Sequence, residues 1–366
     1  MLGNKIYELS LVKDYVSHWG LAEAARELIQ NALDSNSPFS YSFMPGVVEG
    51  QGWTFKLTSE FSRLEPSQLL LGSTSKAEDK QAIGSFGEGF KIALLVLTRL
   101  GKPTTIYNNE LVWTPSFRMN KHFGQELLVI SEQRLAKHEP GLSFVVDDLT
   151  DADRAAIEAC CLKMQPEVGQ IIPTHQGDIL VDRPGELYVG SLFITKTNLK
   201  FGYNIKPEFI SLERDRQTVS DFNLRFTTKD MWFETKRYDE IAQMIADEVP
   251  DLEYAKYSAP EFVKEACYQL FKERNPGALI AETPAQMKAM VEQGLTKTVY
   301  VGGGMYNIVS GSASYRSWKA AEAKPVPSPL AVLEEWLAKN KFHMHASAQK
   351  AFKEELFAAA KFWVAK

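Results

Sequence analysis

The spacing of apolar positions along the chain predicts alternating helices and strands. From Ser17 to Leu33, apolar residues recur every three or four positions, which predicts an amphipathic helix. The apolar stretch Phe90–Leu100 predicts a buried helix closed by Gly101. Short apolar runs predict strands at Tyr41–Met44, Trp53–Thr58, Thr104–Tyr107, Leu111–Phe117, Glu126–Ser131 and Leu142–Val146. This order of elements predicts an α+β layer structure over residues 1–150.

The pattern beyond residue 150 predicts a smaller α/β domain over residues 151–250. Asp151–Met164 is expected to be a helix capped by Thr150 or Asp151. Asp178–Val181 and Glu186–Thr195 are expected to pair around the turn Asp182–Gly185, which contains Pro and Gly.

The last part of the chain, residues 251–366, is predicted to be mostly helical. A helix at Tyr238–Asp247 is predicted just before this part, and helices at Pro260–Arg274 and Pro284–Gln293 and a short strand at Thr296–Val301 are predicted within it. Pro325, Pro327 and Pro329 indicate a linker at 324–329, because proline continues neither a helix nor a strand. Two amphipathic helices are expected beyond this linker.

Composition and charge narrow the class of protein. The 366 residues are 45% hydrophobic and 24% charged, which is typical of globular domains. The longest strongly apolar stretch, Ile92–Leu97, is far too short to span a membrane, and the N-terminus does not resemble a secretion signal. The three cysteines suggest neither a disulfide framework nor a zinc site, so a cytoplasmic location is expected.

The net charge of −5 combines two regions of opposite sign. Residues 313–366 contain nine Lys/Arg and five Asp/Glu, a net +4, which leaves −9 for residues 1–312. The basic C-terminal helices are either a solvated basic face or a surface for an acidic partner.

The first candidate for chemistry is the pair Glu27 and Asn31. A spacing of four residues places both side chains on one face of a helix. A carboxylate beside a carboxamide can orient a water and supply oxygen ligands to Mg²⁺. By itself such a pair is most often part of a solvated helix face.

Three further segments accompany this pair. Ile83–Lys91 places the pattern GxxGxG directly before a helix, where backbone N–H groups and the helix dipole favour phosphate. Lys76 lies eight residues before Gly84 and offers an ammonium group for a phosphate, although by itself it is also typical of an exposed loop lysine. Gly141–Leu149 is expected to be a strand that enters a helix, and it is also compatible with an ordinary core strand.

Together the four segments resemble the Bergerat-fold ATPases, the family of gyrase, Hsp90, histidine kinases and MutL. The family's ExxxNAxD box is matched by Glu27, Asn31, Ala32 and Asp34, and the order STSK then GSFGEGFK is most similar to the MutL and MORC branch. The resemblance covers residues 15–150 and implies a Bergerat-type α/β sandwich that binds ATP and Mg²⁺. The N-box also resembles, more loosely, that of bacteriophage proteins related to the rIIA membrane-integrity protein.

The resemblance implies a role for each matching residue. Glu27 corresponds to the residue that activates the attacking water, Asn31 to the Mg²⁺ ligand and Lys76 to a contact of the phosphates. The other residues that it implies in nucleotide binding are Asp34, Ser59, Ser75, Gly84, Phe86, Gly87, Glu88, Gly89, Phe90, Lys91 and Ser143.

The chain departs from the family pattern where adenine is read. The family's DxGxG box corresponds to Ser59–Arg63, with Ser59 at the Asp position and with Phe61 and Arg63 in place of both glycines. A hydrogen bond to an ionised group contributes about 1.5–3 kcal/mol, so weaker or less selective base binding is expected.

Outside this domain the candidates are weaker. Lys206, Arg214 and Arg216 are candidates for a basic residue that reaches the γ-phosphate from the second domain, although Glu213–Arg216 is also typical of a surface ion-pair cluster. His343 and His345 are too few for a metal site. No histidine-kinase phospho-acceptor segment precedes Glu27, so kinase activity is not expected.

Three hypotheses follow. The first is a slow Mg²⁺-dependent ATPase whose lid, Leu71–Phe90, closes over the phosphates and drives a conformational change or, by analogy with the family, homodimer formation. The second is a pseudo-ATPase binding module that engages a host protein or nucleic acid, favoured by the altered box at Ser59. The third is a MutL- or MORC-type factor whose binding to DNA depends on salt.

Overall fold

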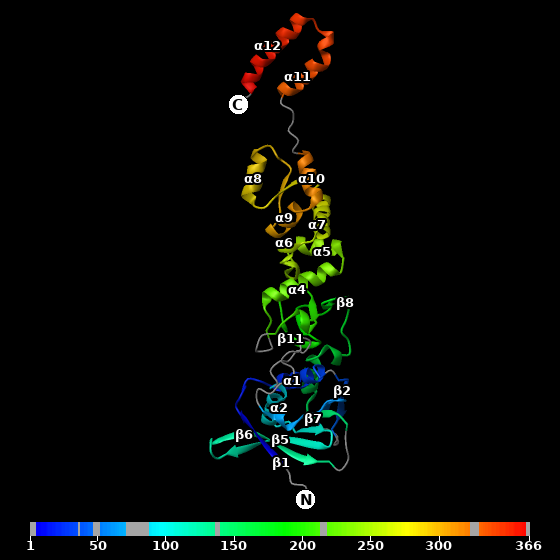
Figure 1. Cartoon of the computed structure of the whole chain (residues 1–366), viewed down its shortest axis with the longest axis vertical. Helices are drawn as coiled ribbons and strands as arrows, with labels where there is room; N and C mark the ends of the chain where they lie inside the picture. The colour runs from blue at the N-terminus through cyan, green and yellow to red at the C-terminus, as the bar shows by residue number, and fades with distance from the viewer. Residues whose placement is uncertain are drawn as a thin grey trace. The chain divides into compact units, whose positions relative to one another are not determined.

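A computed structural model describes residues 5–35, 37–46, 52–70, 88–135, 140–212, 218–322 and 329–363 (Figure 1). The chain divides into two compact units, Met1–Ser258 and Ala259–Lys366. The described residues of the first unit form two sheets with helices, and those of the second are mostly helical. The predicted α+β class is therefore confirmed.

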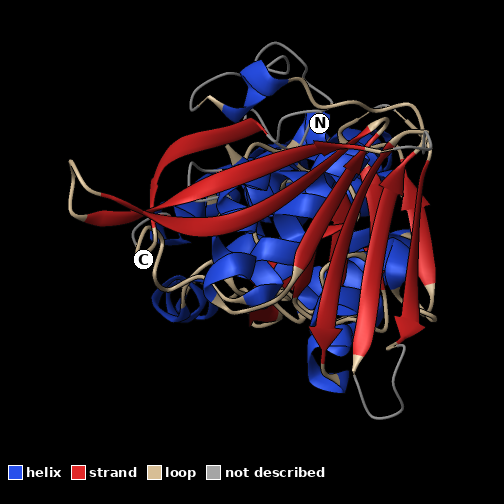
Figure 2. Cartoon of the chain, turned by 90° about the horizontal axis from the view of Figure 1, so that it is seen from below, coloured by secondary structure: helices blue, strands red, loops and turns tan. Residues whose placement is uncertain are grey.

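The first sheet in the described part of the chain has seven antiparallel strands, in the order β1–β6–β5–β4–β7–β3–β2. Figure 2 shows the strands in red, fanned by the twist of the sheet. All the strands predicted before residue 150 are confirmed, and β1 adds to them. Their bounds are β1 Lys5–Val12, β2 Phe39–Pro45, β3 Trp53–Ser59, β4 Thr104–Asn108, β5 Leu111–Asn120, β6 Gln125–Arg134 and β7 Leu142–Leu149.

Two predicted helices, α1 (Leu21–Leu33) and α2 (Gly89–Arg99), pack against each other and share a core with this sheet. The sheet contributes alternate residues such as Phe55, Leu57 and Phe144 to that core, because successive side chains of a strand point to opposite faces. Helix α1 begins at Leu21 rather than at Ser17. The Glu23 carboxylate accepts a hydrogen bond from the Gly20 N–H at 2.8 Å and so satisfies one N–H at the start of the helix.

Helix α3 (Asp151–Ala159) is shorter than the predicted Asp151–Met164. Its N-cap is Thr150, as predicted, whose hydroxyl accepts a hydrogen bond from the Asp153 N–H at 3.1 Å. The prediction of its end is wrong because Cys161 is extended and forms a β-bridge with Leu192. A strand partner 31 residues away in sequence therefore ends this helix.

The second sheet has five strands among the described residues, in the order β11–β10–β12–β9–β8. It is mixed, since β10 is parallel to β12. The predicted pairing around Asp182–Gly185 is wrong, because β12 lies between β9 and β10, and the predicted strand Glu186–Thr195 is two strands that turn at Gly190 and Ser191. The bounds are β8 Ile171–Thr174, β9 Gly177–Leu180, β10 Glu186–Val189, β11 Leu192–Lys196 and β12 Gly202–Ile205.

Helices follow the second sheet and complete the first unit. They are α4 (Asp221–Glu234), α5 (Tyr238–Ala246) and the short α6 (Ala255–Ser258). The 3-10 turn η4 (Pro250–Leu252) carries Asp251, which is fully buried. The Asp251 carboxylate joins this turn to β12, since it accepts hydrogen bonds from Tyr203 Oη and from two backbone N–H groups just before β12.

The second unit contains a short parallel pair, β13 (Leu279–Ala281) and β14 (Thr298–Tyr300), joined through α8 (Pro284–Glu292). The other helices are α7 Glu261–Arg274, α9 Gly303–Ser310, α10 Ala313–Glu322, α11 Pro329–Asn340 and α12 Ala346–Trp363. These include both predicted C-terminal helices. The predicted linker lies outside the described residues except for Pro329. Within the described ranges, no helix has the length and hydrophobicity needed to cross a bilayer.

Candidate functional site

The candidate site is built on the polar face of α1. Glu27 is only 1% exposed, Gln30 is 2% exposed, and Arg26 and Asp34 are also buried. At 100° per residue, Arg26, Glu27, Gln30, Asn31 and Asp34 lie on one side of the helix, and the apolar residues of α1 lie on the side that enters the core. Arg26, Glu27 and Asp34 have partners within the protein, and the concentration of buried charged and amide groups on one face makes this face the candidate for a ligand site.

The amide of Asn31 shows a geometry that suits a metal ligand. Its Nδ2 donates a hydrogen bond to the Glu27 carbonyl at 2.8 Å, which fixes the orientation of the amide. No described residue donates a hydrogen bond to Asn31 Oδ1, which leaves this hard oxygen available. In the described part of the chain, no group of three or more His, Cys, Asp or Glu is arranged to hold a metal. A magnesium ion here would therefore take most of its ligands from phosphates and water, as Mg²⁺ commonly does.

Ser59 ends β3 on the same face as Phe55 and Leu57, the face that packs against the helices. It pairs with Phe39, shortly after the end of α1, and is 6% exposed. The structure thus places Ser59 on the helix side of the sheet, on the strand that α1 contacts.

Ser143 lies on the opposite face of the sheet. Its neighbours Leu142 and Phe144 point into the core with the helices, so Ser143 points away from them. Its hydroxyl lies 2.8 Å from the hydroxyl of Thr58, which also points away from the core. The structure therefore does not bring Ser143 together with Glu27 and Ser59.

The segment directly after β3, residues 60–64, is anchored by Asn108. This side chain is 1% exposed; its Oδ1 accepts from the Leu64 N–H at 3.0 Å, and its Nδ2 donates to the Leu64 carbonyl at 2.7 Å. Gly141, with φ +86°, packs so tightly here that a Cβ would lie 2.7 Å from the carbonyl oxygens of Ser59 and Glu60. These contacts fix the backbone directly after Ser59.

Replacing Asn108 by Leu is expected to lower the free energy of unfolding of the protein by about 2 kcal/mol. Both backbone groups of Leu64 would lose their partner, and an unpaired buried group costs about 1–3 kcal/mol. Urea denaturation of both proteins measures the difference. The variant Glu110→Gln, at a half-buried position nearby in sequence, is the control, and an Asn108→Leu protein as stable as the wild type would contradict this anchoring role.

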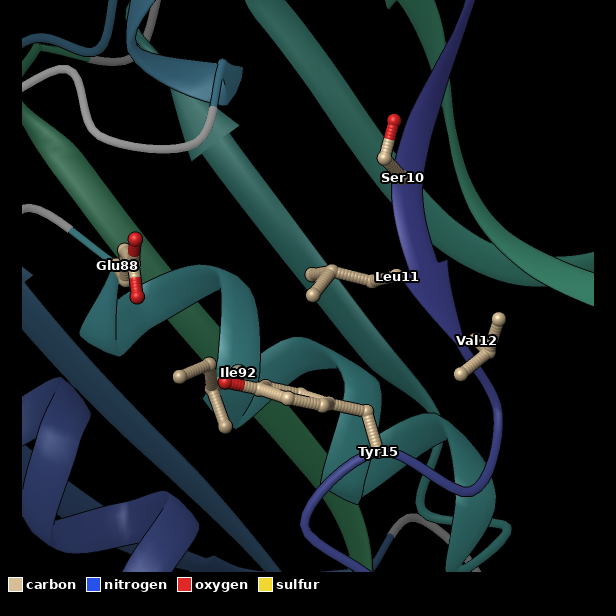
Figure 3. A pocket seen from close by; sticks show the side chains of 6 residues that line it. All are labelled: Ser10, Leu11, Val12, Tyr15, Glu88 and Ile92. Atoms are coloured by element: carbon tan, nitrogen blue, oxygen red, sulfur yellow. The ribbon is translucent and has the colours of Figure 1, made fainter.

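The N-terminus of α2 carries the described end of the glycine-rich motif. Gly89 and Phe90 start the helix, and Glu88 is its N-cap residue. Glu88 also lines a cavity of about 170 Å³ (Figure 3), together with Ser10, Leu11, Val12, Tyr15 and Ile92. Since none of these six lining residues is Lys or Arg, this cavity by itself does not suit a phosphate.

Lys91 is fully buried in the first turn of α2. Its Nζ donates to the carbonyls of Gln68, at 2.9 Å, and of Leu70. Burial lowers the pKa of the Lys91 ammonium, and the nearby Glu88 carboxylate partly offsets this effect. In this structure the ammonium thus joins α2 to the backbone at residues 68–70, and its expected contact with phosphate stays a prediction.

Of the remaining candidates for contact with the nucleotide, some lie within the described residues and others lie outside them. Lys206, which follows β12, is described, and it donates to the His175 carbonyl at 2.6 Å. The predicted residues that lie outside the described ranges are Ser75, Lys76, Gly84, Phe86, Gly87, Arg214 and Arg216.

Two residues of the site are additions to the predicted set. Gln30 is three residues from Glu27, and a spacing of three, like the spacing of four between Glu27 and Asn31, places two residues on one face of a helix. Asn108 has no such local signal, because its partner Leu64 is 44 residues away.

No protein-family model matches the chain. The chain is 26% identical over 221 residues to an uncharacterized protein of Mycoplasma pneumoniae, an alignment that covers 57% of this chain and 89% of the relative.

Proposed function

We propose that the first unit is a Bergerat-type module that binds Mg²⁺ and ATP and hydrolyses the nucleotide slowly. The observation that carries this proposal is the buried polar face of α1, where a carboxylate with 1% exposure lies one turn from an amide oxygen that is free of described partners. This face supports the resemblance of the same residues to the ExxxNAxD box.

In the proposed reaction, Glu27 is the general base that orients a water for attack on the γ-phosphate. Asn31 Oδ1 is the protein ligand of magnesium, which when bound offsets phosphate charge and positions the polyphosphate. Gly84, Gly87, Gly89 and Lys76 are proposed to hold the phosphates. Closure of residues 71–90 would then couple nucleotide binding to a conformational change or to dimerisation.

The part of the proposed site that would bind the adenine ring is expected to recognise it less specifically than in the family. Ser59 offers a neutral hydroxyl where the family has a carboxylate, and a neutral hydrogen bond is weaker than a charge-assisted one. We therefore expect ATP and GTP to differ little in affinity.

A thermal shift experiment on the full chain tests nucleotide binding. A ligand present at 100 times its Kd stabilises the folded state by about 2.7 kcal/mol, which raises the Tm by about 5 °C or more in a unit of this size. The chain is heated with MgCl₂ and millimolar ATP, ADP or GTP, and with MgCl₂ alone as the control. The absence of any shift with all three nucleotides would contradict the proposal.

The second candidate is a binding module that keeps the fold without hydrolysis. It is favoured by the residues at the proposed adenine-binding position. Ser59 stands where the family has an acidic residue, and Phe61, which stands where the family has a glycine, is 81% exposed. An unchanged Tm with nucleotide would support this candidate. Its partner would then be a host protein or a nucleic acid, and salt-dependent binding to DNA would favour the nucleic acid.

A further inference from the structure

Two buried atoms of the α1 polar face, Arg26 Nε and Gln30 Oε1, have no hydrogen-bond partner among the described residues, although Arg26 makes other contacts. Gln30 is 2% exposed, and its Oε1 is buried without a hydrogen-bond partner among the residues that the structure describes. Buried side-chain acceptors are nearly always paired, because leaving one unpaired is unfavourable. The other buried carboxamide near the site, Asn108, has both of its amide atoms paired. Gln30 thus differs from Asn108, and its Oε1 is the buried acceptor of this face that calls for a functional explanation.

The position of Gln30 on α1 relates it to the proposed ligand site. It lies three residues after Glu27 and four before Asp34, so the three side chains follow one another along one face of the helix. A ligand held by Glu27 and Asn31 would lie within reach of the Gln30 amide.

We infer that Gln30 is a further ligand-binding residue whose Oε1 accepts a hydrogen bond from an O–H group of the bound magnesium nucleotide. The donor is either a ribose hydroxyl or a water bound to the magnesium ion. The acceptor has no described partner in the free protein and becomes paired on binding, so its hydrogen bond contributes directly to affinity. This inference rests on the proposed binding of magnesium nucleotide.

The variant Gln30→Met tests the inference through two effects of opposite sign. Methionine has nearly the same length and no oxygen, so it removes the unpaired acceptor while it fills the same space. In the free protein, Tm is expected to rise by about 2–4 °C, because an unsatisfied buried group is lost. The affinity for Mg-ATP, measured by titration calorimetry on the full chain, is expected to fall about tenfold, the usual effect of losing one such hydrogen bond.

Binding of Mg-ATP, of a deoxyribose analogue and of magnesium tripolyphosphate identifies the group that donates to Gln30 Oε1. If the donor is a ribose hydroxyl, Gln30→Met weakens binding of Mg-ATP and leaves binding of the deoxyribose analogue that lacks that hydroxyl unchanged. If the donor is magnesium-bound water, the variant also weakens binding of magnesium tripolyphosphate. Asn108→Leu is the matched control for stability, since it removes a paired carboxamide and is expected to lower the Tm.

The outcomes separate this inference from the proposed function. A wild-type chain that binds none of the three ligands would overturn both. A wild-type chain that binds Mg-ATP, with a Gln30→Met chain of equal affinity, would overturn only the role of Gln30. A decrease in the Tm of free Gln30→Met would also overturn it, because the amide would then contribute to the stability of the free protein.

Discussion

Replacing Glu27 by Ala is expected to lower the rate of ATP hydrolysis by at least about 100-fold while Mg-ATP still binds. A positioned general base accelerates a reaction by about 10²–10⁴-fold, and its removal mainly affects the chemical step. Steady-state phosphate release measures the first effect, and titration calorimetry with Mg-ATP measures the second.

The burial of Glu27 explains why this effect should be large. At 1% exposure, the carboxylate lies where bulk water and salt screen it little, so its interaction with a bound water is stronger than at the surface. The start of the same helix offers a matched control. Glu23 lies one turn earlier and accepts the hydrogen bond of the Gly20 N–H, so Glu23→Ala removes a helix cap and leaves the proposed base in place.

The control separates loss of chemistry from loss of folding. Glu23→Ala is expected to lower stability by about 1 kcal/mol, which is typical of a lost cap, with hydrolysis near the wild-type rate. Hydrolysis by Glu27→Ala at the wild-type rate would remove Glu27 from the role of general base.

The largest effect on stability is expected from Asp251→Ala, at least about 3 kcal/mol. The Asp251 carboxylate is fully buried and accepts from the Lys200 N–H at 2.7 Å, the Phe201 N–H at 3.2 Å and Tyr203 Oη at 2.5 Å. Alanine would leave these donors unpaired, at about 1–3 kcal/mol for each. Urea denaturation followed by circular dichroism measures the loss.

The tyrosine strengthens this network. Burial, together with the charge of Asp251, raises the pKa of Tyr203 well above its usual value, so its hydroxyl keeps its proton and donates. The hydroxyl in turn accepts a hydrogen bond from Trp232 Nε1 at 2.9 Å, which connects β12 to α4. The network thus ties the η4 turn, a strand and a helix together.

An exposed aspartate provides the control for Asp251. Asp247, at the end of α5, accepts hydrogen bonds from the Gln243 amide at the surface. Asp247→Ala is expected to change stability by less than about 0.5 kcal/mol, as is usual for surface substitutions. Equal losses for the two variants would show that the buried network does not account for the effect of Asp251.

Much of the first unit could be predicted from sequence because its signals are local. Helix α1 follows from the three- and four-residue spacing of its apolar residues, and α2 and six strands of the first sheet follow from local apolar runs. The same helical spacing relates residues on one face, so the sequence alone groups Glu27 with Asn31. The alternation of side chains along a strand also places Ser143 on the face away from the core, because its neighbours Leu142 and Phe144 are core residues.

Non-local contacts account for the predictions that were wrong. The turn Asp182–Gly185 has the composition of a hairpin, yet β12 inserts between the strands on either side of it. The helix beginning at Asp151 ends early because Cys161 pairs with Leu192. In both cases a segment distant in sequence supplied hydrogen bonds that the local pattern does not encode.

The sequence by itself determined helices α1 and α2, six strands of the first sheet and which polar residues share the face of α1, because these depend on the local pattern of residues. Only the tertiary structure decided that Glu27 and Gln30 are buried, that Lys91 bonds to the backbone at residues 68–70, and that Asn108 anchors Leu64. Burial and pairing depend on which distant segments cover a side chain. That choice is made by the packing of the whole unit and cannot be read from the neighbours of a residue.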